Sequence, residues 1–430
     1  MRRIKNLKIV SLLRSQIYLV LILTILFDEF DQLTFWFPPL IYSNIFGGFR
    51  FIDFLCFLIF SEIFIYRIVI FRGSFKIVKS INKSLLIFAF AILISVILTL
   101  IKGSFNIFFG WKNLFLGVLF FYSFINAFNS EKEIETLLKC IFNLVFFKSI
   151  YSLILYMLGY GLYTLDKGYV PILFPPSITF VVFINLLALS YLLFGNETVS
   201  KKVLLCLTIG VTLFLIIFSL SRIDWGIYSI GLLTIFIILS FRKKITYFIF
   251  LITLFFLIQL FFPGEFQRAM FHFSQILELL RKPQSFRLES VTMHWFDIIE
   301  ALDQIKQHPI LGIGVGVPYE TKYVYLWKTV SYGVHNGFLN TWFKFGLLGA
   351  IAYIMLFLRF LLTGFKILFI IPINRRILLI APLGTGLGMW IMSFLFAPSN
   401  FENFQKSILV FFCMAVVFIL ENLTRKSIKL

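Results

Sequence analysis

The sequence has few charged residues and few side chains of the kinds that ligate metals. Charged residues make up 14% of its 430 residues, whereas hydrophobic residues make up 60% and aromatic residues 19%. Because about a quarter of the residues in a soluble domain are charged, a water-soluble globular protein is excluded. The four cysteines are scattered singly through apolar runs, which excludes a disulfide framework and a zinc site. We expect them to pack as small hydrophobic side chains: Cys56, Cys140, Cys206 and Cys413.

Acidic residues are also scarce, with 20 against 39 basic residues and a net charge of +19. The basic residues form no single face, which argues against nucleic-acid binding. They follow alternate apolar runs, whereas the first connection reads FDEFDQLTFWFPP and is acidic and aromatic. This asymmetry predicts that both termini lie in the cytoplasm. The basic connections contain Arg72, Lys76, Lys79 and Lys83, then Lys201 and Lys202, then Arg242, Lys243 and Lys244, then Lys366, Arg375 and Arg376.

Long apolar runs are what the sequence has in place of charge. About twelve of them are long enough to cross roughly 30 Å of hydrocarbon as a helix, so we expect an all-α integral membrane protein with about twelve transmembrane helices. No small-residue cleavage site follows the basic MRRIKNLK, which predicts a retained first span. The expected spans are 9–27, 51–71, 84–101, 110–128, 137–160, 177–195, 203–219, 225–241, 245–262, 337–362, 377–397 and 406–421.

One large external connection separates the ninth and tenth expected spans. The chain therefore divides into helices 1–9 (1–262), a large external loop (263–334) and helices 10–12 (335–430). All four histidines fall in the loop or at its exit. We interpret His272, His294 and His308 as polar residues that lie in the loop because it is exposed to water. The histidines are His272, His294, His308 and His335.

Two amphipathic helices are expected in this loop. Apolar residues recur at helical spacing from Phe266 to Leu280, which is typical of a helix lying on a membrane surface. A second helix is expected from about Ser285 to Gln307, ending at the His308-Pro309 pair. The apolar positions are Phe266, Met270, Phe273, Leu277 and Leu280 in the first helix and Trp295, Ile298, Ile299, Leu302 and Ile305 in the second.

A glycine-rich turn, LGIGVGVP, follows the second loop helix. It lacks the GK[ST] of a Walker A sequence, and no strand-helix unit surrounds it as in a dinucleotide fingerprint. We expect its glycines to allow close packing of backbone against backbone.

Three places in this half of the chain have side chains suited to chemistry. Arg222, in FSLSRIDWG, lies where the seventh span turns into the eighth, and a charge at this depth must face water, a partner or a cavity. Arg287 is expected in the first turn of the second loop helix, where backbone N–H groups and a cation favour anions. His335 and Asn336 precede the tenth span. The plainer alternatives are a snorkelling Arg222, a solvated Arg287 and a helix cap at the His-Asn pair.

Together these positions resemble a family signature. The segment HPILGIGVG, followed by HNGFLNTWFKFGLLGAI, is similar to the signature of the bacterial O-antigen ligase and repeat-unit polymerase family. In that family an external loop ends in His-Asn-x-x-Leu and the next span continues to Gly-x-x-Gly. The resemblance extends to SLSR before the eighth span and to an arginine early in the loop, over roughly residues 218–350. The matching residues are His335, Asn336, Leu339, Gly346 and Gly349.

The resemblance implies a membrane glycosyltransferase of the C type, which acts outside the bacterial cytoplasmic (inner) membrane without a cofactor. The donor would be a glycan on undecaprenyl diphosphate, transferred with inversion and without a metal. His335 would be the general base, and Arg222 and Arg287 would bind the diphosphate. Asn336 would position the acceptor or cap the helix. We favour a polymerase, which transfers the glycan to a second lipid-linked unit, over a ligase, which transfers it to lipid A core or protein.

Two rivals remain open. Other C-type glycosyltransferases place acidic residues in the first external loop with a divalent cation, and Asp28, Glu29 and Asp31 lie there; we expect no metal, because the positive-inside rule also leaves acidic residues outside. The second rival is a transporter or a flippase of glycan lipids. Charges in or near the spans favour it, but the long loop breaks the symmetry between halves that such carriers show. These charges are Asp53, Glu62, Arg67 and Lys148.

Overall fold

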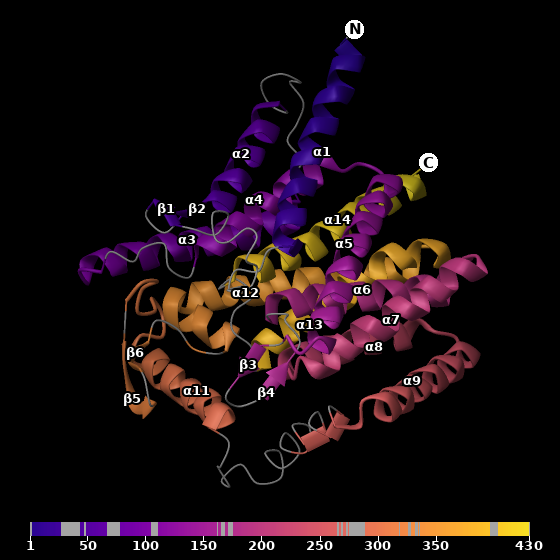
Figure 1. The fold of residues 1–430 in the computed structure, drawn as a ribbon. Coiled ribbons are helices and arrows are strands. Elements are labelled where there is room, and N and C mark those ends of the chain that lie inside the picture. The colour runs from indigo at the N-terminus through magenta and orange to yellow at the C-terminus, as the bar shows by residue number, and fades with distance from the viewer. Residues whose placement is uncertain are drawn as a thin grey trace.

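The computed structural model is a bundle of helices, and the chain reverses direction between successive helices (Figure 1). It describes residues 2–26, 44–46, 49–66, 78–104, 111–160, 162–164, 168–170, 175–264, 289–317, 319–325, 328–331, 334, 336–395 and 403–429, with single residues between 266 and 274.

Each of the twelve expected apolar runs forms a helix. Uninterrupted apolar sequence allows a helix to satisfy every backbone hydrogen bond within itself, as a membrane span requires. The helices are α1 (Arg2–Leu26), α2 (Phe51–Ile65), α3 (Lys79–Ile101), α4 (Lys112–Ala127), α5 (Glu131–Met157), α6 (Pro175–Phe194), α7 (Val199–Phe218), α8 (Arg222–Ile238), α9 (Phe241–Phe261), α12 (Gly337–Ile370), α13 (Ile373–Leu395) and α14 (Phe404–Lys429).

Eight of these helices are long and apolar enough to cross a membrane, counted over the described part of the chain. They are α3, α5, α6, α7, α9, α12, α13 and α14, and the apolar stretches of α1 and α4 are shorter. The expected all-α integral membrane fold is therefore confirmed, while the number of twelve crossings stays a prediction.

Three short antiparallel hairpins accompany the helices in the described residues. They are β1 (Asn44–Phe46) with β2 (Phe49–Arg50), β3 (Leu162–Thr164) with β4 (Gly168–Val170), and β5 (Tyr319–Tyr325) with β6 (Lys328–Ser331). They lie in connections between helices, and β5–β6 lies next to α11 (Glu289–Gln307).

The helices are arranged around a buried centre. In α6, α13 and α14 about four fifths of the most apolar stretch is buried (78%, 83% and 78%), whereas in α9 only 6% is. In Figure 1, α9 lies at the margin of the bundle, and α12, α13 and α14 lie near its middle. An apolar surface such as that of α9 suits contact with lipid.

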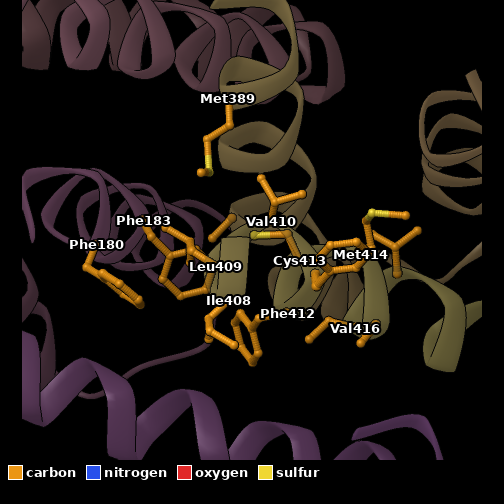
Figure 2. Packing of buried hydrophobic residues seen from close by; sticks show 14 of the residues in the cluster. Phe180, Phe183, Met389, Ile408, Leu409, Val410, Phe412, Cys413, Met414 and Val416 are labelled. Atoms are coloured by element: carbon orange, nitrogen blue, oxygen red, sulfur yellow. The ribbon is translucent and has the colours of Figure 1, made fainter. Parts of the chain in front are cut away.

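The centre is packed by aromatic and aliphatic side chains of α6, α13 and α14, as Figure 2 shows. Phe183 of α6 meets Phe412 of α14 edge to face, with ring centroids 5.7 Å apart. Met389 of α13 approaches the same cluster, and Cys413 is fully buried within it. All four cysteines are free in the structure.

The second loop helix is α11, which ends at Gln307, directly before the expected His308-Pro309 stop. Among its described side chains, from residue 298 on, Ala301 and Ile305 are buried and belong to one cluster with Phe343 of α12. Leu302, expected on the apolar side, is 41% exposed. Leu302 is therefore not part of this packed cluster. Most of the first expected loop helix lies outside the described residues.

Candidate functional site at the end of the bundle where α8 and α12 begin

The starts of α8 and α12 meet around the end of α13. A Cβ atom added at Gly226 of α8 would lie 2.3 Å from Met392 Sδ of α13, and one at Gly388 would lie 2.7 Å from the Ile227 carbonyl oxygen. Alpha8 therefore begins beside the end of α13. The start of α12 is tied to this same end of α13 by Asn336. Arg222 and Asn336, which are 114 positions apart, thus belong to one end of the bundle.

The turn before α8 holds its backbone in an unusual conformation. Leu220 is buried and has φ 51°, the only positive φ of a non-glycine residue in the described part of the chain. Such a conformation persists only when the surroundings impose it, and it is common at functional sites. Here Ser219 Oγ accepts a hydrogen bond from the Ser221 amide at 3.3 Å. Arg222 follows as the first residue of α8 and is partly exposed.

Asp224 fixes this turn to the neighbouring helix α6. Its carboxylate is buried and accepts hydrogen bonds from Ser221 Oγ at 2.5 Å and from Thr179 Oγ1 of α6 at 2.8 Å. One helical turn further on, Tyr228 donates to the Asn185 side chain of α6 at 2.9 Å. Two buried hydrogen bonds therefore fix the position of the beginning of α8 along α6. Buried carboxylates need such partners because isolation in an apolar interior is costly.

Asn336 is the N-cap residue of α12. Its side-chain oxygen accepts a hydrogen bond from the Leu339 amide at 2.9 Å. Its side-chain nitrogen donates to the carbonyl oxygens of Phe394 and Leu395, at 2.9 and 3.1 Å. The side-chain amide of Asn336 thus provides hydrogen-bond partners both for a backbone N–H at the start of α12 and for backbone carbonyl oxygens at the end of α13. Its part in acceptor positioning stays a prediction.

Helix α12 is interrupted at Gly346. This residue has φ 68° and ψ −168°, a conformation open to glycine and disfavoured for other residues. A Cβ atom there would lie 2.1 Å from the carbonyl oxygen of Ile310, so no side chain fits. Alpha12 therefore consists of a short first half from 337 to 345 and a long second half from 347 to 370.

The glycine-rich turn fills this interruption. The amide of Ile313 donates to the Phe343 carbonyl oxygen at 2.9 Å, and that of Gly314 donates to Lys344 O at 3.3 Å. Gly312 and Gly314 both have positive φ, and a Cβ at Gly312 would lie 2.7 Å from Lys344 O. The expectation of close backbone packing is therefore confirmed, and the turn supplies hydrogen bonds that α12 lacks where it breaks.

The second half of α12 is joined to the same turn. The Leu347 amide donates to Ile310 O at 3.0 Å, and Trp342 Nε1 donates to Pro309 O at 2.9 Å. Lys344, at the break, is 1% exposed. The burial of this charge could not be predicted from the sequence, because Lys344 stands alone among apolar neighbours.

The remaining candidate residues lie outside the described part of the chain. They are His335, Arg287 and the acidic residues Asp28, Glu29 and Asp31. Their roles stay predictions. Among the described residues, no group of three or more His, Cys, Asp or Glu is placed to hold a metal ion.

Two of the four charges that favour a transporter have structural partners among the described residues. Asp53 pairs with Lys112 of α4 at 2.7 Å. Lys148 of α5 donates to the carbonyl oxygen of Ile25 in α1 at 2.7 Å and to Ser177 Oγ of α6 at 3.0 Å. These contacts tie α2 to α4, and α5 to the end of α1 and the start of α6. Arg67, the expected partner of Glu62, lies outside the described residues.

The fold defines a multi-pass membrane protein, and the candidate functional site at one end of its bundle is built from two helix starts and one interrupted helix. A comparison with protein families gives the more specific class: residues 206–354 match the model described as O-Antigen ligase. The resemblance to the O-antigen ligase and repeat-unit polymerase family is thus confirmed over a stretch that contains the starts of both α8 and α12. No curated protein matches the chain significantly. The match indicates a membrane glycosyltransferase-like enzyme of lipopolysaccharide biosynthesis.

Proposed function

We propose that the protein polymerises lipid-linked oligosaccharide repeat units. It would transfer a glycan from undecaprenyl diphosphate to a sugar hydroxyl of a second lipid-linked unit, outside the cytoplasmic membrane, with both of its termini in the cytoplasm. The observation that carries the proposal is that two helix starts within the matched residues 206–354 converge on the end of α13: the start of α8, which begins with Arg222, and the start of α12, which is capped by Asn336.

The reaction needs a base for the acceptor and a cation for the leaving group. The acceptor oxygen attacks the anomeric carbon, a new glycosidic bond forms, and the bond to the diphosphate breaks with its electron pair on the departing phosphate oxygen. His335 takes the hydroxyl proton. Arg222 and Arg287 bind the diphosphate and stabilise the charge that develops on it. Attack from the face opposite the diphosphate inverts the anomeric configuration, and no metal takes part.

The described geometry supports this assignment for Arg222. The strained turn at Leu220 and the buried hydrogen bonds of Asp224 fix the start of α8. The side chain of Arg222 is therefore attached to a rigid part of the backbone. Rigid support of this kind is what electrostatic stabilisation of a leaving group requires, because the donor must be in place before charge develops.

A ligase is the second candidate, and the description of the matching family favours it. Its donor and leaving group are the same, so Arg222, Arg287 and His335 would have the same roles. The acceptor alone would differ, being lipid A core or a protein instead of a second lipid-linked unit.

The transporter reading is disfavoured by the interruption of α12. Interrupted helices of transporters leave backbone groups open to the substrate or ion. Here the amides of Ile313 and Gly314 already occupy the carbonyl oxygens of Phe343 and Lys344. The break is therefore used for internal packing.

A reconstituted transfer assay tests the proposal. Purified protein would be given the lipid-linked oligosaccharide of its host in EDTA, and products would be separated by size. We expect a ladder of lengths that disappears with His335→Ala and Arg287→Ala and falls at least about 100-fold with Arg222→Ala.

The matched control is Arg242→Ala, because Arg242 is an exposed arginine in the first turn of α9. This variant should keep the ladder. A single product that forms only with added lipid A core would establish the ligase instead. Full transfer by His335→Ala would refute the catalytic assignment, and movement of the glycan lipid between leaflets without transfer would establish the transporter.

A further inference from the structure

Helix α3 carries a row of polar side chains towards the glycine-rich turn. Ser95 and Thr99 are fully buried, and Lys102 and Ser104 follow at the end of the helix. A Cβ atom at Gly314 would lie 2.8 Å from Thr99 Oγ1, so the turn and α3 are in close contact. Polar residues inside an apolar span are costly unless they find partners.

Three of these side chains donate to carbonyl oxygens where the glycine-rich turn meets the break in α12 at Gly346. We call this contact region the joint. Ser95 Oγ donates to Lys344 O at 2.8 Å. Lys102 Nζ donates to Ile313 O at 3.1 Å, and Ser104 Oγ donates to Gly316 O at 2.7 Å. Alpha3 and the residues directly after it therefore contact both sides of the break: the glycine-rich turn at Ile313 and Gly316, and the first half of α12 at Lys344.

Alpha3 lies outside residues 206–354, so the family match gives it no role. Its contacts are 211 to 249 positions away in sequence. What it holds is the short first half of α12, whose N-cap is Asn336 and whose preceding residue is His335.

We propose that Lys102 and Ser104 are positioning residues for glycan transfer. They fix the glycine-rich turn against the break in α12 and thereby fix the start of α12, where the acceptor is to be deprotonated. This inference rests on the proposed function. A small displacement of reacting groups by a remote change lowers turnover by about 10- to 100-fold, whereas substrate binding by groups elsewhere is unaffected.

The double variant Lys102→Met, Ser104→Ala tests this role, because it removes both donors and keeps the approximate side-chain volumes. We expect kcat for transfer to fall about 10- to 100-fold with little change in KM for the donor. Lys102→Arg and Ser104→Thr each keep a hydrogen-bond donor and should retain most of the activity. If only side-chain size mattered, the double variant without donors would retain activity as well.

Hydrogen exchange gives a readout that does not depend on activity. The amides of Ile313, Gly314 and Leu347 donate across the joint, and in the double variant we expect them to exchange at least about tenfold faster. Amides at the far end of α12, around Leu368, should be unchanged, and the melting temperature should fall only slightly.

A rise in KM with unchanged kcat would overturn the inference, since Lys102 or Ser104 would then contact substrate directly. Unchanged kcat with faster exchange would overturn it as well, because the joint would loosen without consequence. If the wild-type protein transfers no glycan, the proposed function fails, and the exchange rates alone then decide whether α3 fixes the turn.

Discussion

The start of α8 and the break in α12 are both held in place at the same end of the bundle, but by different means. At α8 the contacts are made by side chains, since the Asp224 carboxylate accepts from Ser221 and Thr179. At α12 backbone groups contact one another directly, with amides of the glycine-rich turn donating to carbonyl oxygens of the helix. A side-chain contact is removed directly by changing one partner, whereas a backbone contact is affected only indirectly, through changes that displace the chain.

This difference predicts how each site responds to substitution. At the break, adding a single carbon atom should be the most harmful change, because the backbones touch. At α8, removing oxygen atoms should be most harmful, because the oxygens carry the contact. The following predictions are arranged by the size of the expected effect.

The largest effect is expected for Gly346→Ala. The new Cβ would lie 2.1 Å from Ile310 O, and φ 68° is unfavourable for alanine. We expect transfer to be lost and the free energy of unfolding to fall by more than about 3 kcal/mol. Thermal unfolding in detergent and the transfer assay measure the two effects.

The control is Gly210→Ala in α7, where no atom lies within 4 Å of the added Cβ. It should leave both quantities unchanged or raise stability slightly. Gly103→Ala adds a second control, since it has φ 73° but open space around it. A Gly346→Ala protein as stable as the Gly103→Ala protein would refute the close contact at the break.

A smaller loss is expected for Asp224→Ala. The substitution leaves the hydroxyls of Ser221 and Thr179 without their buried acceptor, which costs roughly 2 to 3 kcal/mol. Arg222 directly follows the turn that Asp224 holds in place. The substitution should therefore lower kcat for glycan transfer as well as the melting temperature. The matched control is Asp303→Ala, whose contact with Lys306 is at the surface; exposed pairs contribute about 0 to 1 kcal/mol. Equal effects of the two variants would contradict the role of Asp224.

Trp342→Phe should have a modest effect. It removes the Nε1 donor to Pro309 O while keeping a large aromatic ring, so we expect a loss of about 1 kcal/mol with activity largely retained. Backbone hydrogen bonds across the break stay in place in this variant. A collapse of activity would mean that the indole, and not the backbone, holds the turn.

The smallest expected effect is a pH dependence of stability from His308. Burial, with the nearby Lys102 cation as a second cause, lowers the pKa of His308 below its ordinary value. The unfolded state then binds the proton more readily, so stability is full above the ordinary pKa of about 6.5 and falls as the pH drops through it. Melting temperatures between about pH 5 and 7.5 should show a shallower slope for His308→Gln. An unchanged slope would exclude this contribution.

The positions of the helices could be predicted from the sequence, because apolar runs of sufficient length leave the backbone no alternative to a helix in lipid. The expected run 203–219 and the observed helix Val199–Phe218 differ by a few residues at the start. There the polar residues Lys201 and Lys202 continue the helix beyond the apolar part. Packing between helices was not predictable, because spans that are apolar on all sides show no preferred face.

The site was predictable in part. The glycine-rich turn was expected to pack closely, and Asn336 was considered as a cap, since both follow from local chemistry. The break at Gly346 was not foreseen, because a single glycine in an apolar run is compatible with a helix and its partner Ile310 is 36 positions away. Asp224 was also missed, although Ser221 and Asp224 have the Ser-x-x-Asp spacing typical of a helix start. His335 and Arg287 remain predictions.

The burial of α14 has a consequence for how the protein is made. No residue from Ile408 to Leu420 is more than 4% exposed, and the helix packs against α4, α12 and α13. It follows all other described helices in the chain, so it leaves the ribosome after them. Until then, the faces of its neighbours are covered by lipid or by insertion machinery. The bundle therefore closes around α14 only after the other described helices have been made, and a chain that stops before Phe404 leaves uncovered the faces of the helices on which α14 packs.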